Sequence, residues 1–136
     1  MFLALAVAVV TACPTAVDRD EIHYLDPDHR SLVQPLAGEI ENAAKVKFVQ
    51  VEVVEVVNPR RIALVFELHY EREGEQPIHL GDFTLYPADR PGRFIIPTQG
   101  KLKPAGAVVL TMTSPEKIER GDPVRASVKR LRFLQR

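Results

Sequence analysis

Four histidines offer the widest choice of chemistry in this sequence: His23, His29, His69 and His79. Neutral imidazole is a common ligand of Zn(II) and Cu(II). His69 and His79 stand in two strand-like segments joined by a short loop, so we expect them to lie side by side as a cross-strand pair. With His23 or His29 they could bind a metal ion. No ligand spacing is diagnostic, however, and ordinary surface histidines are the favoured interpretation.

Motifs typical of enzymes are missing from the sequence. It contains no GxSxG, HExxH or glycine-rich phosphate-binding motif. A cupredoxin copper site is excluded because the single cysteine, Cys13, lies far along the chain from Met112. The stretch DPDHR (26–30) fits a weak Ca²⁺ site or, as we favour, a solvated turn. We therefore predict that the protein is not an enzyme, with a hydrolase that uses an unrecognised carboxylate site as the least favoured alternative.

Length and charge narrow the class of protein further. The chain has 136 residues, the size of one domain, with 46% hydrophobic and 26% charged residues. It carries 18 Lys plus Arg and 18 Asp plus Glu, so its formal net charge is zero. Proteins that bind nucleic acids usually have a clear basic excess. We therefore expect no nucleic-acid partner.

The strands that would position the four histidines follow an apolar leader, MFLALAVAVVTACPTAV (1–17). This leader contains no charged residue, and the first charge of the chain is Asp18. It is shorter than the roughly 20 residues of a membrane span. Its tetrapeptide Val10-Thr11-Ala12-Cys13 resembles the lipobox of bacterial lipoproteins, in which an aliphatic residue and small residues precede the cysteine. The leader departs from a usual signal sequence in having no Lys or Arg before the apolar run.

This resemblance implies that residues 1–12 are a signal segment and that Cys13 carries a covalent lipid, the only prosthetic group we expect. The protein would then be anchored to a membrane of the bacterial cell envelope and face the periplasm or the exterior. Three other arrangements are compatible with the leader. Cys13 could be a small buried residue of a core strand, the leader could stay on the protein as a membrane anchor, or it could pack on the domain as an apolar helix.

The rest of the chain is predicted to form a lead-in and one β domain. Residues 13–45 contain the lipid-attachment cysteine and an irregular lead-in. Residues 46–136 contain short alternating or β-branched runs separated by Pro and Gly, and no long amphipathic helix. This pattern predicts an all-β, antiparallel, two-sheet sandwich of immunoglobulin-like type with about seven strands, with an open barrel as the alternative. A change of alternation at 53–54 predicts either a β-bulge or a strand that crosses from one sheet to the other, and a second change falls near Arg130.

The end of the chain is basic, with seven Lys or Arg against three Asp or Glu between residues 116 and 136. Arg125, Lys129, Arg130 and Arg132 could form a contact surface for anionic lipid or an acidic partner, or the solvated face of an edge strand. We predict a membrane-anchored, non-catalytic accessory or scaffold lipoprotein that binds another envelope protein. The alternative is a periplasmic metal-binding or small-ligand-binding protein that uses the four histidines.

Overall fold

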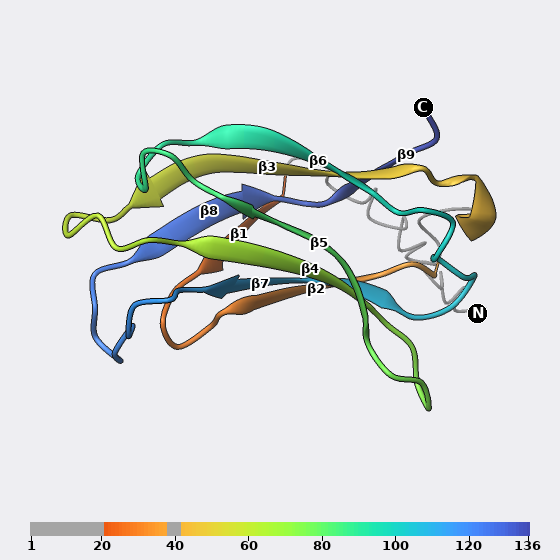
Figure 1. Cartoon of the computed structure of the whole chain (residues 1–136), viewed down its shortest axis with the longest axis horizontal. Helices are drawn as coiled ribbons and strands as arrows, with labels where there is room; N and C mark the ends of the chain where they lie inside the picture. The colour runs from red at the N-terminus through yellow and green to blue at the C-terminus, as the bar shows by residue number, and fades with distance from the viewer. Residues whose placement is uncertain (1–20, 38–41) are drawn as a thin grey trace, which may run out of the picture.

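The computed structural model describes residues 21–37 and 42–136 (Figure 1). Nine strands and one short 3-10 turn form in these residues, and no α-helix. The elements are β1 (Ile22–Leu25), β2 (Ser31–Pro35), η1 (Ala43–Lys45), β3 (Phe48–Val57), β4 (Val65–Glu71), β5 (Ile78–Thr84), β6 (Gly92–Pro97), β7 (Ala107–Thr113), β8 (Arg125–Lys129) and β9 (Arg132–Leu134). Cys13, the leader and the rest of residues 1–20 lie outside the described residues.

The strands form two antiparallel sheets that pack face to face (Figure 1). Sheet A has the order β1-β8-β3-β6, and β9 pairs with β3 as a continuation of β8. Sheet B has the order β2-β7-β4-β5. The predicted all-β sandwich is confirmed, with nine strands in place of about seven.

The connections between the strands follow a jelly-roll order. β1 pairs with β8, β2 with β7, β3 with β6 and β4 with β5, so the chain resembles one long hairpin rolled into two sheets. In an immunoglobulin domain the first two strands are neighbours in one sheet, whereas here β1 and β2 lie in different sheets. The immunoglobulin-like prediction therefore holds for the layered architecture and not for the connectivity.

The first two strands come from the segment that we expected to be irregular. β1 has four residues and β2 has five, which is too short for a clear periodic pattern. Their partners lie far along the chain, with Leu25 opposite Ala126 and Leu32 opposite Leu110. The prediction of an irregular segment is wrong for residues 22–25 and 31–35, because contacts distant in sequence stabilise these strands.

The core lies between the two sheets. Ile62, Leu64, Phe66, Leu68 and Tyr70, which alternate along one face, are all at least 95% buried. An aromatic stack then links the two layers, because Phe83 of sheet B packs against Phe66 and against Phe94 of sheet A. The ring centroids of these two pairs are 5.1 and 3.9 Å apart.

Both predicted changes of alternation are present. The pairing of β3 with β8 shifts between Val53 and Glu55, so Val54 is the extra residue of a bulge. The bulge lets Val53 and Val56 both contact the core although they are three residues apart. The second change separates β8 from β9 at residues 130–131.

A buried amide connects the two sheets at this second interruption. Gln34 of β2 is 97% buried, and its side chain accepts a hydrogen bond from the Leu131 N–H at 2.8 Å and donates one to the Leu131 carbonyl at 2.9 Å. Because buried backbone groups must be paired, the Gln34 amide stabilises the point at which β8 passes into β9.

We predict that Gln34→Ala lowers the free energy of unfolding by about 2–4 kcal/mol, because it leaves both buried backbone groups of Leu131 without a partner. Urea denaturation measures the change. The matched control is Gln76→Ala, in which the glutamine is exposed in the β4–β5 loop. Equal stability of the two variants would contradict the role of the Gln34 amide.

Candidate functional site

The predicted histidine pair is present. His69 of β4 lies opposite His79 of β5, and the two rings meet edge to face with centroids 5.3 Å apart. Both side chains point away from the core, because the adjacent Leu68 and Tyr70 face inward. Nε2 of His79 also lies 3.7 Å from Oδ2 of Asp82. The pair is thus a feature of the outer face of sheet B.

The other two histidines do not join this pair. His23 lies on β1 of sheet A, where its Nε2 is 3.6 Å from a carboxylate oxygen of Glu21. His29 lies in the β1–β2 turn, with Nδ1 3.4 Å from Asp26. Within residues 21–37 and 42–136, no group of three or more His, Cys, Asp or Glu residues is placed to hold a metal ion.

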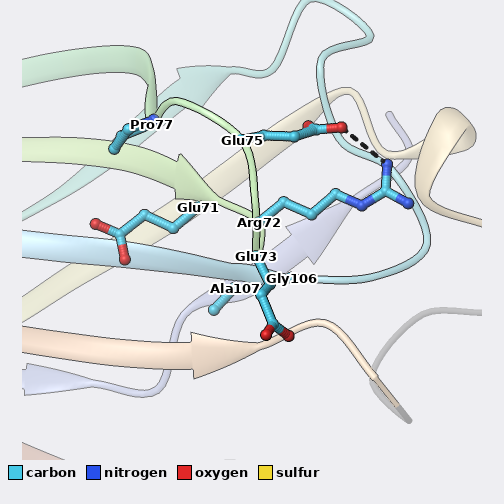
Figure 2. Close-up of a pocket in the computed structure, with 7 residues that line it drawn as sticks. All are labelled: Glu71, Arg72, Glu73, Glu75, Pro77, Gly106 and Ala107. Atoms are coloured by element: carbon cyan, nitrogen blue, oxygen red, sulfur yellow. Dashed lines mark ion pairs between the residues drawn. The ribbon is translucent and has the colours of Figure 1, made fainter.

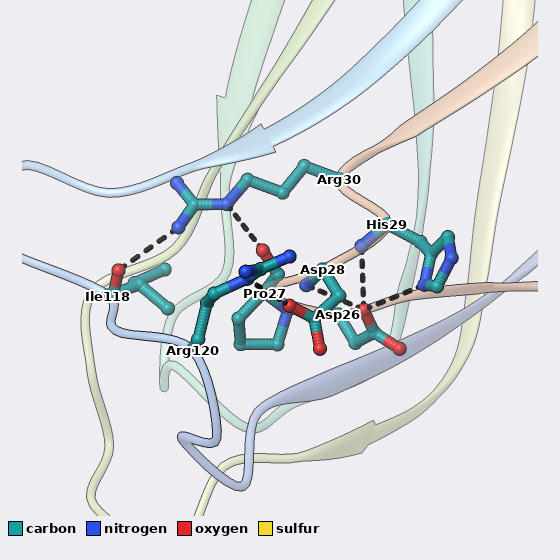
Figure 3. Close-up of polar contacts among 7 residues, drawn as sticks. All are labelled: Asp26, Pro27, Asp28, His29, Arg30, Ile118 and Arg120. Carbon is teal, nitrogen blue, oxygen red and sulfur yellow. Dashed lines mark hydrogen bonds and ion pairs between the residues drawn. The ribbon is translucent and has the colours of Figure 1, made fainter.

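The DPDHR segment forms a compact turn (Figure 3). Asp26 Oδ1 accepts hydrogen bonds from the backbone N–H groups of His29 at 2.7 Å and Asp28 at 2.8 Å. The His29 N–H is the main cause that holds the pKa of Asp26 below its ordinary value, since it stabilises the charged carboxylate. Asp28 forms an ion pair with Arg120 at 3.0 Å. These contacts support the turn interpretation of both carboxylates.

An arginine ties this turn to the loop before β8. Arg30 Nε donates to the Pro27 carbonyl at 3.1 Å, and Nη2 donates to the Ile118 carbonyl at 3.0 Å (Figure 3). The guanidinium therefore joins two loops that are 88 residues apart in the sequence. Arg30 of the DPDHR motif therefore has a structural role, since it holds the two loops together.

An open depression of about 450 Å³ lies beside the β4–β5 loop (Figure 2). Its lining includes Glu71, Arg72, Glu73 and Glu75. Arg72 extends to Glu75, with 3.5 Å between Nη1 and Oε1, while the carboxylates of Glu71 and Glu73 point in different directions. The three glutamates do not converge on one point, so the depression does not have the geometry of a pair of catalytic carboxylates.

The predicted basic contact surface is largely paired with acidic side chains. Nitrogen–oxygen distances of 3.9, 3.8 and 3.9 Å join Arg125 to Glu55, Lys129 to Glu52 and Arg130 to Glu21. Arg132, on β9, forms no ion pair with any residue in the described ranges. The sequence did not reveal these pairs, because Glu52 and Glu55 lie on β3, about 70 residues earlier in the chain.

The outer face of sheet A carries exposed apolar side chains among these ion pairs. We define the sheet A face by Tyr24, Val54, Val57 and Ile95, whose exposed fractions are 57, 36, 37 and 49%. The guanidinium of Arg125 lies over the Tyr24 ring, 5.3 Å from its centroid. The sequence does not reveal this surface, because its residues come from three strands, β1, β3 and β6, that only the fold brings into one sheet.

Comparison with family models finds no match for the chain, and comparisons with curated proteins and with solved structures find none either. Among residues 21–37 and 42–136, no helix is long and apolar enough to cross a membrane.

The Asp26 turn predicts a pH dependence of stability. Because the pKa of Asp26 is lowered in the folded state, its carboxylate stabilises the protein above the ordinary carboxyl pKa, and this stabilisation is lost as the pH falls through the lowered value. We expect an NMR titration of the Asp26 carboxyl to have its midpoint below 3.8. Asp26→Asn should remove this part of the pH dependence, and a midpoint at or above 3.8 would contradict the assignment.

Proposed function

We propose that this protein is a lipid-anchored, non-catalytic accessory or scaffold subunit of the bacterial cell envelope that binds another envelope protein. The observation that carries the proposal is the lipobox-like Val10-Thr11-Ala12-Cys13. Cys13 stands eight residues before Glu21, the first described residue. At about 3.3–3.6 Å per residue, this linker spans at most roughly 29 Å. A lipid on Cys13 would hold the sandwich close to the membrane surface.

The uses of the acidic side chains support a non-catalytic role. Asp26 bonds to the backbone of its own turn. Asp122 accepts the Glu119 N–H at 2.7 Å, and Glu116 accepts the Ala63 N–H at 2.8 Å. These three carboxylates therefore have a structural role in stabilising their loops.

The composition of the sheet A face supports a role in binding a protein. Tyrosine and arginine are enriched at the energetic centres of protein–protein interfaces. Tyr24 and Arg125 contact one another on this face, and Val57 lies directly opposite Arg125 on β3. We therefore propose the sheet A face as the docking surface for the partner.

A periplasmic metal-binding or ligand-binding function is the second candidate, and the contact between His69 and His79 favours it. Two imidazoles supply half of the four ligands typical of a structural zinc site. Saturable Zn²⁺ binding that is lost in His69→Asn would support this candidate over a scaffold role.

We predict that a photo-crosslinking residue in place of Tyr24 or Ile95 captures one and the same envelope protein in intact cells. The same residue in place of Val33 is the matched control, because Val33 is 56% exposed but lies on sheet B. The Tyr24 and Ile95 adducts should disappear when Cys13→Ala prevents anchoring. Equal capture from Val33, or no capture from Tyr24 and Ile95, would contradict the proposed docking surface.

A further inference from the structure

Three separate segments of the chain meet at one end of the sandwich. The Lys47 N–H donates to the Leu134 carbonyl at 2.8 Å, the Thr98 N–H donates to the Lys47 carbonyl at 2.9 Å, and the Lys101 N–H donates to the Thr98 carbonyl at 3.0 Å. The chain around η1, the start of the β6–β7 connection and the C-terminus therefore lie together (Figure 1). The β1–β2 turn lies at the opposite end (Figure 1).

Basic residues that form no ion pair within the described part of the chain gather at this end. We define the basic end by five residues: Lys45, Lys47, Lys101, Arg132 and Arg136. None of them forms an ion pair with a residue of the described ranges, and all except the half-buried Lys101 are exposed. This distinguishes them from Arg125, which is paired with Glu55.

The acidic β4–β5 loop forms no ion pair with the described residues of the basic end. The β4–β5 loop carries Glu73 and Glu75, and Glu75 is already shared between Arg72 at 3.5 Å and Lys103 at 3.6 Å. Counting the described residues alone, the basic end thus keeps a concentrated positive charge although the whole chain has a formal net charge of zero. Such a charge attracts an anionic surface within a Debye length, about 8–10 Å at physiological ionic strength.

The direction of β1 relates the basic end to the linker. β8 and β9 run toward Leu134, which contacts Lys47, and β1 is antiparallel to β8. The chain therefore enters β1 from the side of the basic end, where the Arg130 N–H donates to the Glu21 carbonyl at 3.0 Å. Seven residues separate Glu21, on this side, from Cys13.

We propose that the basic end rests on the anionic phospholipid headgroups of the membrane to which Cys13 is anchored. This inference rests on the proposed lipid anchor and adds an orientation to it. A covalent lipid and a polybasic surface together bind a membrane more firmly than either does alone. The contact would direct the β1–β2 turn away from the membrane and hold the sheet A face at a fixed angle to the bilayer.

The test uses the protein purified from its native membranes and added to vesicles of phosphatidylcholine, alone or with about 30% phosphatidylglycerol. A water-soluble reagent acetylates exposed lysines, and mass spectrometry follows each site. We expect Lys45, Lys47 and Lys101 to react at least about threefold more slowly in the anionic vesicles, and high salt to remove the difference. Lys117 is the control, since it lies in the loop before β8, away from the basic end, and should react equally in both vesicles.

A charge-reversal variant tests the same contact from the protein side. In Lys47→Glu/Lys101→Glu, Lys45 should react at the same rate in both vesicles, whereas Lys117→Glu should leave its protection unchanged. Thermal unfolding of each variant shows that the fold is retained.

The outcomes separate the two proposals. Protein that does not partition into either vesicle would overturn the anchor and this orientation together. Protein that partitions but shows equal lysine reactivity in both vesicles would overturn the headgroup contact alone. Protection that appears only in native envelope membranes, and not in the anionic vesicles, would overturn it in favour of an acidic protein partner.

Discussion

The pairing of the first two strands with the last strands of the chain is the constraint on which the rest of the structure depends. β1 and β2 complete one edge of each sheet through β8 and β7. The Gln34 side chain reinforces this closure by bonding to Leu131 across the sandwich. The break that it stabilises lets β9 continue along β3, which places Arg132 opposite Gln50 and brings Leu134 beside Lys47. Closure of the jelly roll and assembly of the basic end are therefore linked.

Much of the sandwich was predictable because its central strands are long and strongly patterned. The alternation from Ile62 to Tyr70 predicts a buried face, and the change of alternation at Val53–Val54 predicts a bulge, and both are confirmed. The connectivity was not predictable in the same way. Short strands such as β1 carry little pattern of their own, and their place is decided by partners about 100 residues away.

For the candidate site too, local contacts were predictable from the sequence and contacts between distant segments were not. The contact between His69 and His79 followed from a local hairpin and is confirmed. Whether the last strands present free positive charge depended instead on the residues of the neighbouring strand. That strand is β3, whose Glu52 and Glu55 form ion pairs with Lys129 and Arg125. The basic end escaped prediction because three separate segments build it, and no single stretch of the sequence contains its charge.

The central claim is that Cys13 anchors this sandwich to a membrane through a lipid. The most direct measurement is the intact mass of the protein purified from its native membrane. The account predicts a chain that lacks residues 1–12 and carries the mass of a lipid on its N-terminal cysteine. A chain that keeps Met1 and has an unmodified Cys13 thiol would contradict it.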